Sequence, residues 1–455
     1  MENINFLPVI AALLLLAVIN LFVFFNFDFL QPVIIFFVSM LVSVLLGIIN
    51  IERWGLYVGP LTTVIVVSGM SVFAIGAVFL HLNYRRYHFY QHTKPKLPSL
   101  GIFQIPVQIT VLCSLIIIVL AYYSARELYL LSLELGNHDG IFNMIRILRY
   151  PLEKGDIHFS RMISYRNLIS MVIATSYLYF FISNLISRKS ISRSDLILAI
   201  PILLEIPFFI FSTGRRSIVH FVISGLVMAV ILYQRKYGPT RAARKKMVKL
   251  IGFTGVFSIS LYFILGFFTG KVSIGGRGPL TIISHYGGLS VPALEQYVSA
   301  VHVENQYFLQ NTMMGIYGNL NSLGFHLEPG RPFLPFVEFQ GTEHITTNVY
   351  TVFYRLLADY SFPGLLIIMF LFGVILTYFY DDLKHNNSSC KLVIYSYYGY
   401  IPFFLFIDDQ FMGIFTSRTV YFCILLTGFI YLLERKYFKL CVNGEKDMES
   451  DAKST

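Results

Sequence analysis

Continuous apolar runs recur along almost the whole chain, and each is long enough to cross a lipid bilayer. Such runs lie at 5–25, 29–49, 60–82, 104–124, 166–186, 195–213, 217–234, 250–268, 361–380, 391–407 and 418–434. Because 56% of the residues are hydrophobic and 13% are charged, a water-soluble fold could not bury this much apolar surface. The sequence therefore predicts an all-α fold, a polytopic transmembrane helical bundle of about 11 spans of about 20 residues each, forming a single integral membrane domain over 1–455.

Lys and Arg side chains gather in alternate connections between these runs. The densest is the basic loop 235–249, which the positive-inside rule assigns to the cytoplasm together with the polar tail 440–455. Orientation and attraction to anionic lipid explain the net charge of +10, so membrane lipid is the expected partner and nucleic acid is not. The connections 125–165 and 269–349 then lie outside the cell.

These two outer connections differ in character. Residues 125–165 place Leu and Ile at helical spacing among arginines, which predicts an interfacial amphipathic helix. Its arginines would meet either lipid headgroups or a phosphorylated lipid substrate. Residues 269–349 are rich in Gly, Pro, His, Glu and Asn, too polar for lipid, so we expect a partly helical functional loop there.

Two polar features interrupt the apolar helices. Glu205 lies between Pro201 and Pro207, and a carboxylate within the membrane needs a partner or a water-filled cavity. It is either a functional group or a structural one, neutral or paired, that holds helices together, with His220 on the next helix as the candidate partner. The tight corner at Gly214 presents Arg215 and Arg216 beside the start of a helix, where they either bind an anion or extend to the membrane surface.

Opposite charges cluster at the predicted outer ends of the last helices. Arg355 and Asp359 share a helix face at i and i+4, where they form either a local ion pair or part of a charged cavity. Asp408, Asp409 and Arg418 are expected at the same depth. The helix that carries Arg355 must break near Pro363 and Gly364, since a straight helix to Tyr380 would exceed the hydrocarbon thickness.

Three short motifs resemble the Wzy-type polysaccharide repeat-unit polymerases of O-antigen and capsule synthesis. They are STGRRS at 212–217, TTNVYTVFYRLLADYSFPG at 346–364 and SRTV at 417–420. The resemblance implies a GT-C-like, metal-independent glycosyltransferase in the bacterial cytoplasmic (inner) membrane. Such an enzyme moves a growing glycan from undecaprenyl diphosphate to an incoming lipid-linked repeat at the extracytoplasmic face. A chain-length regulator and a flippase would be its partners.

The chemistry of that transfer selects the candidate site residues. A diphosphate leaving group calls for arginines, and an acceptor hydroxyl calls for a carboxylate or imidazole base. The candidate catalytic residues are His344, Asp408, Asp409 and Asp359. The candidate substrate-binding residues are Arg215, Arg216, Arg277, Arg331, Arg355, Arg418, His285, Tyr286, Asn348 and Tyr360. No metal site and no cofactor are expected.

Two other functions fit the same sequence. A polysaccharide ligase would share the donor and differ in its acceptor, and no residue pattern separates the two enzymes. A flippase or transporter of lipid-linked glycan would also be polytopic and basic. Transporters commonly carry internal repeats and midplane sites, whereas the polar residues here gather toward the outer ends of the runs.

Overall fold

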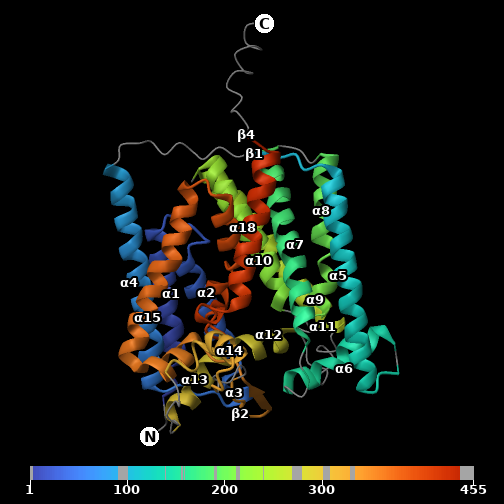
Figure 1. Ribbon diagram of the computed structural model, residues 1–455. Helices are drawn as coiled ribbons and strands as arrows, with labels where there is room; N and C mark the ends of the chain where they lie inside the picture. Colours follow the sequence, from blue (N-terminus) through green and yellow to red (C-terminus); the bar gives the residue numbers. More distant parts are fainter. Residues whose placement is uncertain are drawn as a thin grey trace. The chain divides into compact units, whose positions relative to one another are not determined.

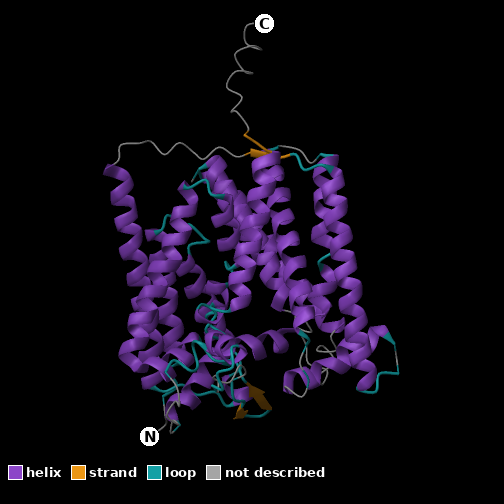
Figure 2. Ribbon diagram, in the orientation of Figure 1, coloured by secondary structure: helices purple, strands orange, loops and turns teal. Residues whose placement is uncertain are grey.

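The structure is a computed structural model. It describes residues 4–90, 101–138, 140–154, 157, 159–188, 192–211, 216–238, 240–268, 279–300, 308–327 and 334–440. These residues are mostly helical, with two small two-stranded sheets (Figures 1 and 2).

Seven helical segments among the described residues are long and apolar enough to cross a membrane. They are Leu7–Phe24, Pro60–Tyr84, Val107–Glu134, Arg161–Ser187, Arg193–Phe211, Ser217–Tyr237 and Val352–His385. This confirms an all-α membrane protein. The other four apolar runs are also helical over much of their length, and the span count of about 11 stays a prediction.

The chain divides into two compact units, each assembled from separate stretches of sequence. Unit 1 comprises Met1–Thr93, Gly275–Asp382 and Tyr400–Val420, and unit 2 comprises Lys94–Ile274, Leu383–Gly399 and Tyr421–Thr455.

Unit 1 contains the first helices, the described parts of the polar loop and the long helix that follows it. Its elements are α1 (Leu7–Phe24), α2 (Pro32–Ile48), α3 (Ile51–Trp54), α4 (Pro60–Tyr90), α12 (Pro279–Gly287), α13 (Ser290–Ser299), α14 (Met314–Ser322), β2 (Val337–Gln340), β3 (His344–Thr347), α15 (Val352–His385), α17 (Ile401–Phe404) and the 3-10 turn η1 (Met412–Ile414).

Glycines bring α4 and α15 into close contact in unit 1. A Cβ at Gly373 would lie 2.1 Å from the Phe73 carbonyl oxygen, and one at Gly76 would lie 2.3 Å from that of Phe370. Only hydrogen fits at both positions, so the two helix backbones pack directly against each other.

The long helix α15 breaks as the sequence predicts. Ser361 has φ 54° and ψ −178°, which is not helical. Pro363, two residues later, has no N–H to donate to the carbonyl of Asp359 and disfavours the helical conformation of the residue before it. The short segment before the break, which carries Arg355 and Asp359, is therefore separately oriented.

The polar loop folds differently from the expectation in one respect. The spacing of Tyr297, Val301, Phe308 and Met313 predicts one amphipathic helix over 294–318. In the structure, α13 ends at Ser299 and α14 begins at Met314. The antiparallel hairpin β2–β3, which pairs Gln340 with His344, was not anticipated. Its short alternating strands carry too little apolar pattern to stand out.

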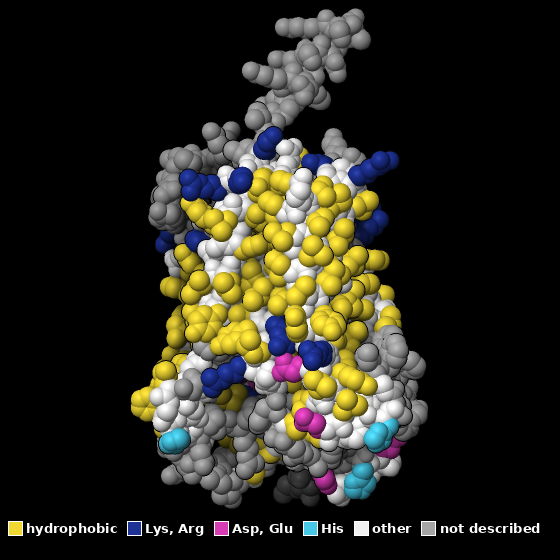
Figure 3. All heavy atoms as spheres, turned by 45° about the vertical axis from the view of Figure 1, so that its right-hand side comes forward, with side chains coloured by type: hydrophobic (Ala, Val, Ile, Leu, Met, Phe, Trp, Pro, Cys, Tyr) yellow, Lys and Arg dark blue, Asp and Glu magenta, His cyan; other side chains and the backbone are white. Residues whose placement is uncertain are grey.

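Unit 2 contains the middle helices and the last helix. Its elements are β1 (Gly101–Phe103), α5 (Val107–Glu134), α6 (Ile141–Lys154), α7 (Arg161–Ser187), α8 (Arg193–Leu203), α9 (Ile206–Phe211), α10 (Arg216–Tyr237), α11 (Arg241–Phe268), α16 (Ser389–Tyr397), most of α18 (Ser417–Tyr437) and β4 (Phe438–Leu440). Hydrophobic side chains cover the middle of the face in Figure 3, as lipid-facing helices require.

Within unit 2 the predicted interfacial segment contains the helix α6. The basic segment 235–249 is helical rather than a loop on both sides of Gly238, because α10 continues to Tyr237 and α11 starts at Arg241. Of the predicted tail 440–455, only Leu440 lies in the part of the chain that the structure describes, as the last residue of β4.

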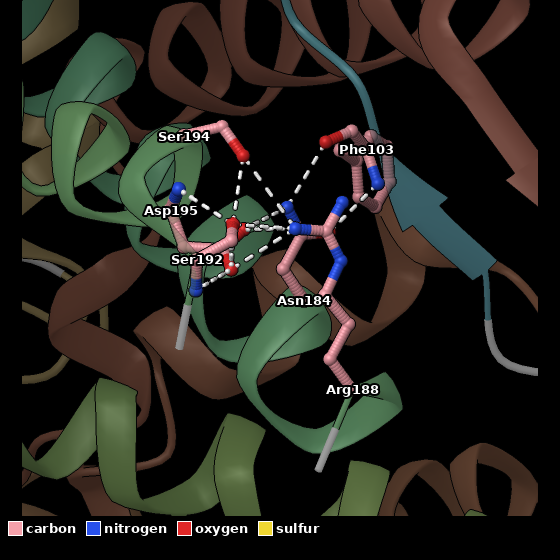
Figure 4. A network of polar contacts seen from close by, with 6 residues as sticks. All are labelled: Phe103, Asn184, Arg188, Ser192, Ser194 and Asp195. Carbon is pink, nitrogen blue, oxygen red and sulfur yellow. Dashed lines mark hydrogen bonds and ion pairs between the residues drawn. The ribbon is translucent and has the colours of Figure 1, made fainter. Parts of the chain in front are cut away.

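A polar network holds β1 against the α7–α8 corner (Figure 4). The Asn184 side chain accepts from the Phe103 amide at 2.7 Å and donates to the Phe103 carbonyl at 2.9 Å. It also donates to the buried Asp195 carboxylate, which pairs with Arg188 at 3.2 Å. Asp195 in turn completes the capping box of α8 with Ser192.

Candidate functional site

A buried ion pair links the start of α15 to the segment after α17. The Arg355 side chain is 2% exposed and donates through Nε to Asp408 Oδ1 at 2.7 Å and through Nη2 to Asp408 Oδ2 at 3.0 Å. This two-bond geometry is the strongest that arginine makes with a carboxylate. The alternative of a local ion pair with Asp359 is replaced by a partner 53 positions along the chain.

Asp359 anchors the segment that leads into α14. Its carboxylate accepts from the amides of Asn311 at 3.0 Å and Thr312 at 2.7 Å, and also from the side chains of both residues. Arg355 donates from Nη1 to the Asn311 carbonyl at 3.2 Å. Two adjacent turns of α15 therefore hold this stretch of the polar loop in place.

Asp409 is the most deeply buried carboxylate of this group. Its Oδ1 accepts from the amides of Phe411 at 2.9 Å and Met412 at 3.0 Å, while no hydrogen-bond partner for Oδ2 is found among the described residues. Burial raises the pKa of Asp409 to about 7, with the Asp408 charge adding to it and the two amides and Arg355 opposing it. The group therefore exchanges a proton close to neutral pH.

Tyrosine rings pack beside this cluster. Tyr354 on α15 lies 4.4 Å from Tyr297 on α13 and 4.6 Å from Tyr350, measured between ring centroids. Burial raises the pKa of Tyr297 to about 12, and the Tyr354 and Asp359 charges add to the shift. The Tyr297 phenol thus stays protonated at neutral pH. A tyrosine ring combines an apolar face with a hydrogen-bonding tip, and this combination suits a sugar ring.

We call Arg355, Asp359, Asp408, Asp409 and their partners Asn311 and Thr312 the carboxylate cluster. It unites three of the four predicted catalytic residues and one predicted arginine. Tyr360, another predicted residue, is partly buried near it, since the Asp359 and Asp409 charges both act on its phenol. Asn311, Thr312 and Tyr297 were missed, because nothing in the local sequence marks them as partners of α15.

The remaining predicted residues of the polar loop lie around the hairpin. His285 on α12 contacts the Thr346 carbonyl at 2.7 Å, and its neighbour Tyr286 is 37% exposed. His344 is exposed on β3, and Asn348 follows that strand. No hydrogen bond joins His344 or Asn348 to the carboxylate cluster within the described ranges, which leaves the aspartates as the better-supported bases.

The predicted arginines are described less completely. Arg215, Arg277 and Arg331 lie outside the described residues, and so does the side chain of Arg216, the first residue of α10 in unit 2. Arg418 is exposed at the start of α18. The structure thus gives contacts for one of the six predicted arginines, Arg355, whose charge is already compensated by Asp408.

Glu205 lies elsewhere, in unit 2 between α8 and α9. The candidate partner His220 does not hydrogen bond to it: among the described residues, the side chain that does so is Ser170 on α7. Whether Glu205 is functional or structural stays a prediction.

Comparison of the chain with protein-family models, with curated proteins and with solved structures finds no match. In the part of the chain that the structure describes, no three His, Cys, Asp or Glu side chains gather in a way that would hold a metal ion. A functional assignment therefore depends on the geometry of the carboxylate cluster.

Proposed function

We propose that the protein is a glycosyltransferase that polymerises undecaprenyl-diphosphate-linked oligosaccharide repeat units into a surface polysaccharide. It would work at the outer face of the bacterial cytoplasmic membrane, with a flippase and a chain-length regulator as partners. The observation that carries the proposal is Asp409, a buried carboxyl with one uncommitted oxygen and a pKa near neutrality, beside a fixed ion pair.

In the proposed reaction, Asp409 acts as the general base. The acceptor hydroxyl oxygen forms a bond to the anomeric carbon of the donor glycan while the bond from that carbon to the diphosphate oxygen breaks. The hydroxyl proton passes to Asp409 Oδ2, and the diphosphate leaves with the bonding electrons. A base whose pKa lies near the working pH is the most effective for such a transfer.

The neighbouring residues have supporting roles in this proposal. Asp408 and Arg355 fix the backbone at Asp409, because Asp408 Oδ1 also accepts from the Asp409 amide at 2.8 Å. Binding of the acceptor must uncover Oδ2, which is buried in the free protein. The anchored segment at Asn311 and Thr312 is well located to couple the polar loop to that step.

The developing charge on the diphosphate needs positive groups. We assign this role to the other predicted arginines of unit 1, Arg277, Arg331 and Arg418, since Arg355 is already neutralised by Asp408. Preorganised arginines stabilise such a leaving group by charge-assisted hydrogen bonds. The partly buried tyrosines at 297 and 354 supply stacking surfaces for the glycan.

The test uses the purified full-length protein in lipid vesicles with a lipid-linked repeat unit as the sole substrate. A polymerase makes a ladder of products from it, whereas a ligase or a transporter does not. Asp409→Asn should abolish the ladder, while Glu343→Gln, which alters an exposed pair with Arg53, should leave it intact. A normal ladder from Asp409→Asn would remove the base assignment, and no ladder from the unaltered protein would remove the function.

A further inference from the structure

A carboxylic acid lies at a helix break inside unit 2. Helix α8 ends at Leu203 and α9 begins at Ile206, so Glu205 belongs to the turn between them. Pro207 has no N–H to donate to the Leu203 carbonyl, which explains why the helix does not continue. Main-chain hydrogen bonding resumes directly after the turn, since the Glu205 carbonyl accepts from the Phe208 amide at 3.0 Å.

The Glu205 side chain is fully buried, with 0% of its surface exposed. The Ser170 hydroxyl on α7 donates to Oε2, and Oε1 has no hydrogen-bond partner among the described residues. A core cluster that includes Ala174, Phe209 and Phe221 occupies the adjoining turns of α7, α9 and α10. An ionised carboxylate in such surroundings, with one hydroxyl as its donor, would be strongly unfavourable.

The charged groups on the helices packed around α8 and α9 do not compensate Glu205. One turn before Ser170 on α7, Arg166 is paired with Glu127 of α5 at 2.8 Å, so the two charges cancel each other. His220 on α10 makes no hydrogen bond to Glu205, whose described partner is Ser170. Glu205 therefore lacks a positive partner in the described part of unit 2.

We propose that Glu205 is a proton-binding site, with an exchangeable proton on Oε1 and Ser170 bound to Oε2. Because Oε1 has no hydrogen-bond partner among the described residues, a proton bound there is not held by an acceptor. Release of the proton would leave a buried charge, which the α8–α9 break can relieve by turning the side chain toward water. This site is independent of the proposed glycosyl transfer.

The first test is labelling with dicyclohexylcarbodiimide, an apolar reagent that adds to protonated carboxylic acids within membranes. The full-length protein in phosphatidylglycerol vesicles is treated across a pH series and analysed by peptide mass spectrometry. Glu205 should be labelled at mildly acidic pH, and its labelling should fall as the pH rises. Glu127, ion-paired and part-exposed, is the internal control that should stay unlabelled.

Two variants distinguish a proton site from a carboxyl that is buried for packing alone. Glu205→Gln should lose both the label and the infrared band of a protonated carboxyl. Ser170→Ala should keep the label and shift its loss to higher pH, because the serine hydroxyl stabilises the ionised form. If the infrared spectrum of the unaltered protein contains no protonated-carboxyl band that Glu205→Gln removes, or if that band does not decline as the pH rises, the proposal is refuted. Protection of Glu205 by Na⁺ at constant pH would likewise refute it, in favour of a metal-cation site.

Discussion

Removal of the Asp408 charge should destabilise unit 1 more than removal of its partner Arg355. Loss of one member of a buried pair costs about 3–5 kcal/mol, because the other charge is left uncompensated. Asp408→Asn leaves the cation of Arg355, whose side chain is 2% exposed, whereas Arg355→Met leaves a carboxylate that is 24% exposed. Water can solvate the Asp408 carboxylate that remains in Arg355→Met, but not the Arg355 guanidinium that remains in Asp408→Asn.

The expected costs follow from those exposures. We expect about 3 kcal/mol for Asp408→Asn, the lower end of the range because Asp408 is partly hydrated. Arg355→Met should cost about 1–2 kcal/mol, mainly through lost hydrogen bonds. The double variant should be more stable than Asp408→Asn alone, since it removes the stranded cation as well.

The protein provides its own probe for this measurement. Trp54 is the sole tryptophan of the sequence, is fully buried and belongs to unit 1. Its fluorescence during denaturant titration in detergent therefore reports on the unfolding of that unit. Glu343→Gln is the control: its pair with Arg53 has side chains 37% and 42% exposed, and loss of such a surface pair costs less than about 1 kcal/mol. Equal midpoints for Asp408→Asn and Glu343→Gln would refute the reasoning.

Three more substitutions in unit 1 test its other contacts. Asp359→Ala should raise the rate of amide hydrogen exchange at Asn311 and Thr312 by about tenfold or more, because each hydrogen bond to a charged acceptor contributes about 1.5–3 kcal/mol. The exposed Glu338→Ala is the control and should leave these rates unchanged. Unchanged rates in Asp359→Ala would contradict the role of Asp359 in holding this segment. The pKa of Asp409 is raised from 3.8 to about 7 in the folded protein, so the folded state holds the proton more tightly and its stability should fall as the pH rises between these values. Asp409→Asn should flatten that dependence in the Trp54 titration, and a slope retained in this variant would identify another group as its source. Gly373→Ala should lower stability by about 1–3 kcal/mol because its methyl group meets the Phe73 backbone, whereas Gly318→Ala on α14 of the same unit, with open space around it, should not lower stability in the same titration.

The helical class could be predicted from sequence because it depends on the length of apolar runs alone. The break in α15 was also predictable, since Pro363 acts within a few residues of its own position. The partner of Arg355 was not, because local spacing offers Asp359 at i+4 while the fold supplies Asp408 from 53 positions away. The hydrogen bond from Asn311 to Asp359 could not be predicted for the same reason, because the two residues are 48 positions apart.

The residues around Glu205 show the same difference between what the sequence predicts and what only the fold reveals. Its importance was visible from the cost of a carboxylate within an apolar run flanked by prolines. Its partner was not, because a serine on α7 carries no charge and no motif. The sequence thus identifies which groups are energetically unusual, and the tertiary structure is needed to find what each one contacts.

The pairing of β1 with β4 has a consequence for the order in which the protein is made. The register pairs Gly101 of β1 with Leu440 of β4, so β1 has no partner strand until synthesis has reached Leu440. At about 5–20 residues per second, that delay is roughly 20–70 s. Throughout this interval β1 stays unpaired while much of unit 1 is synthesised. The membrane insertion machinery must therefore protect a partly assembled unit 2 until β4 has been made.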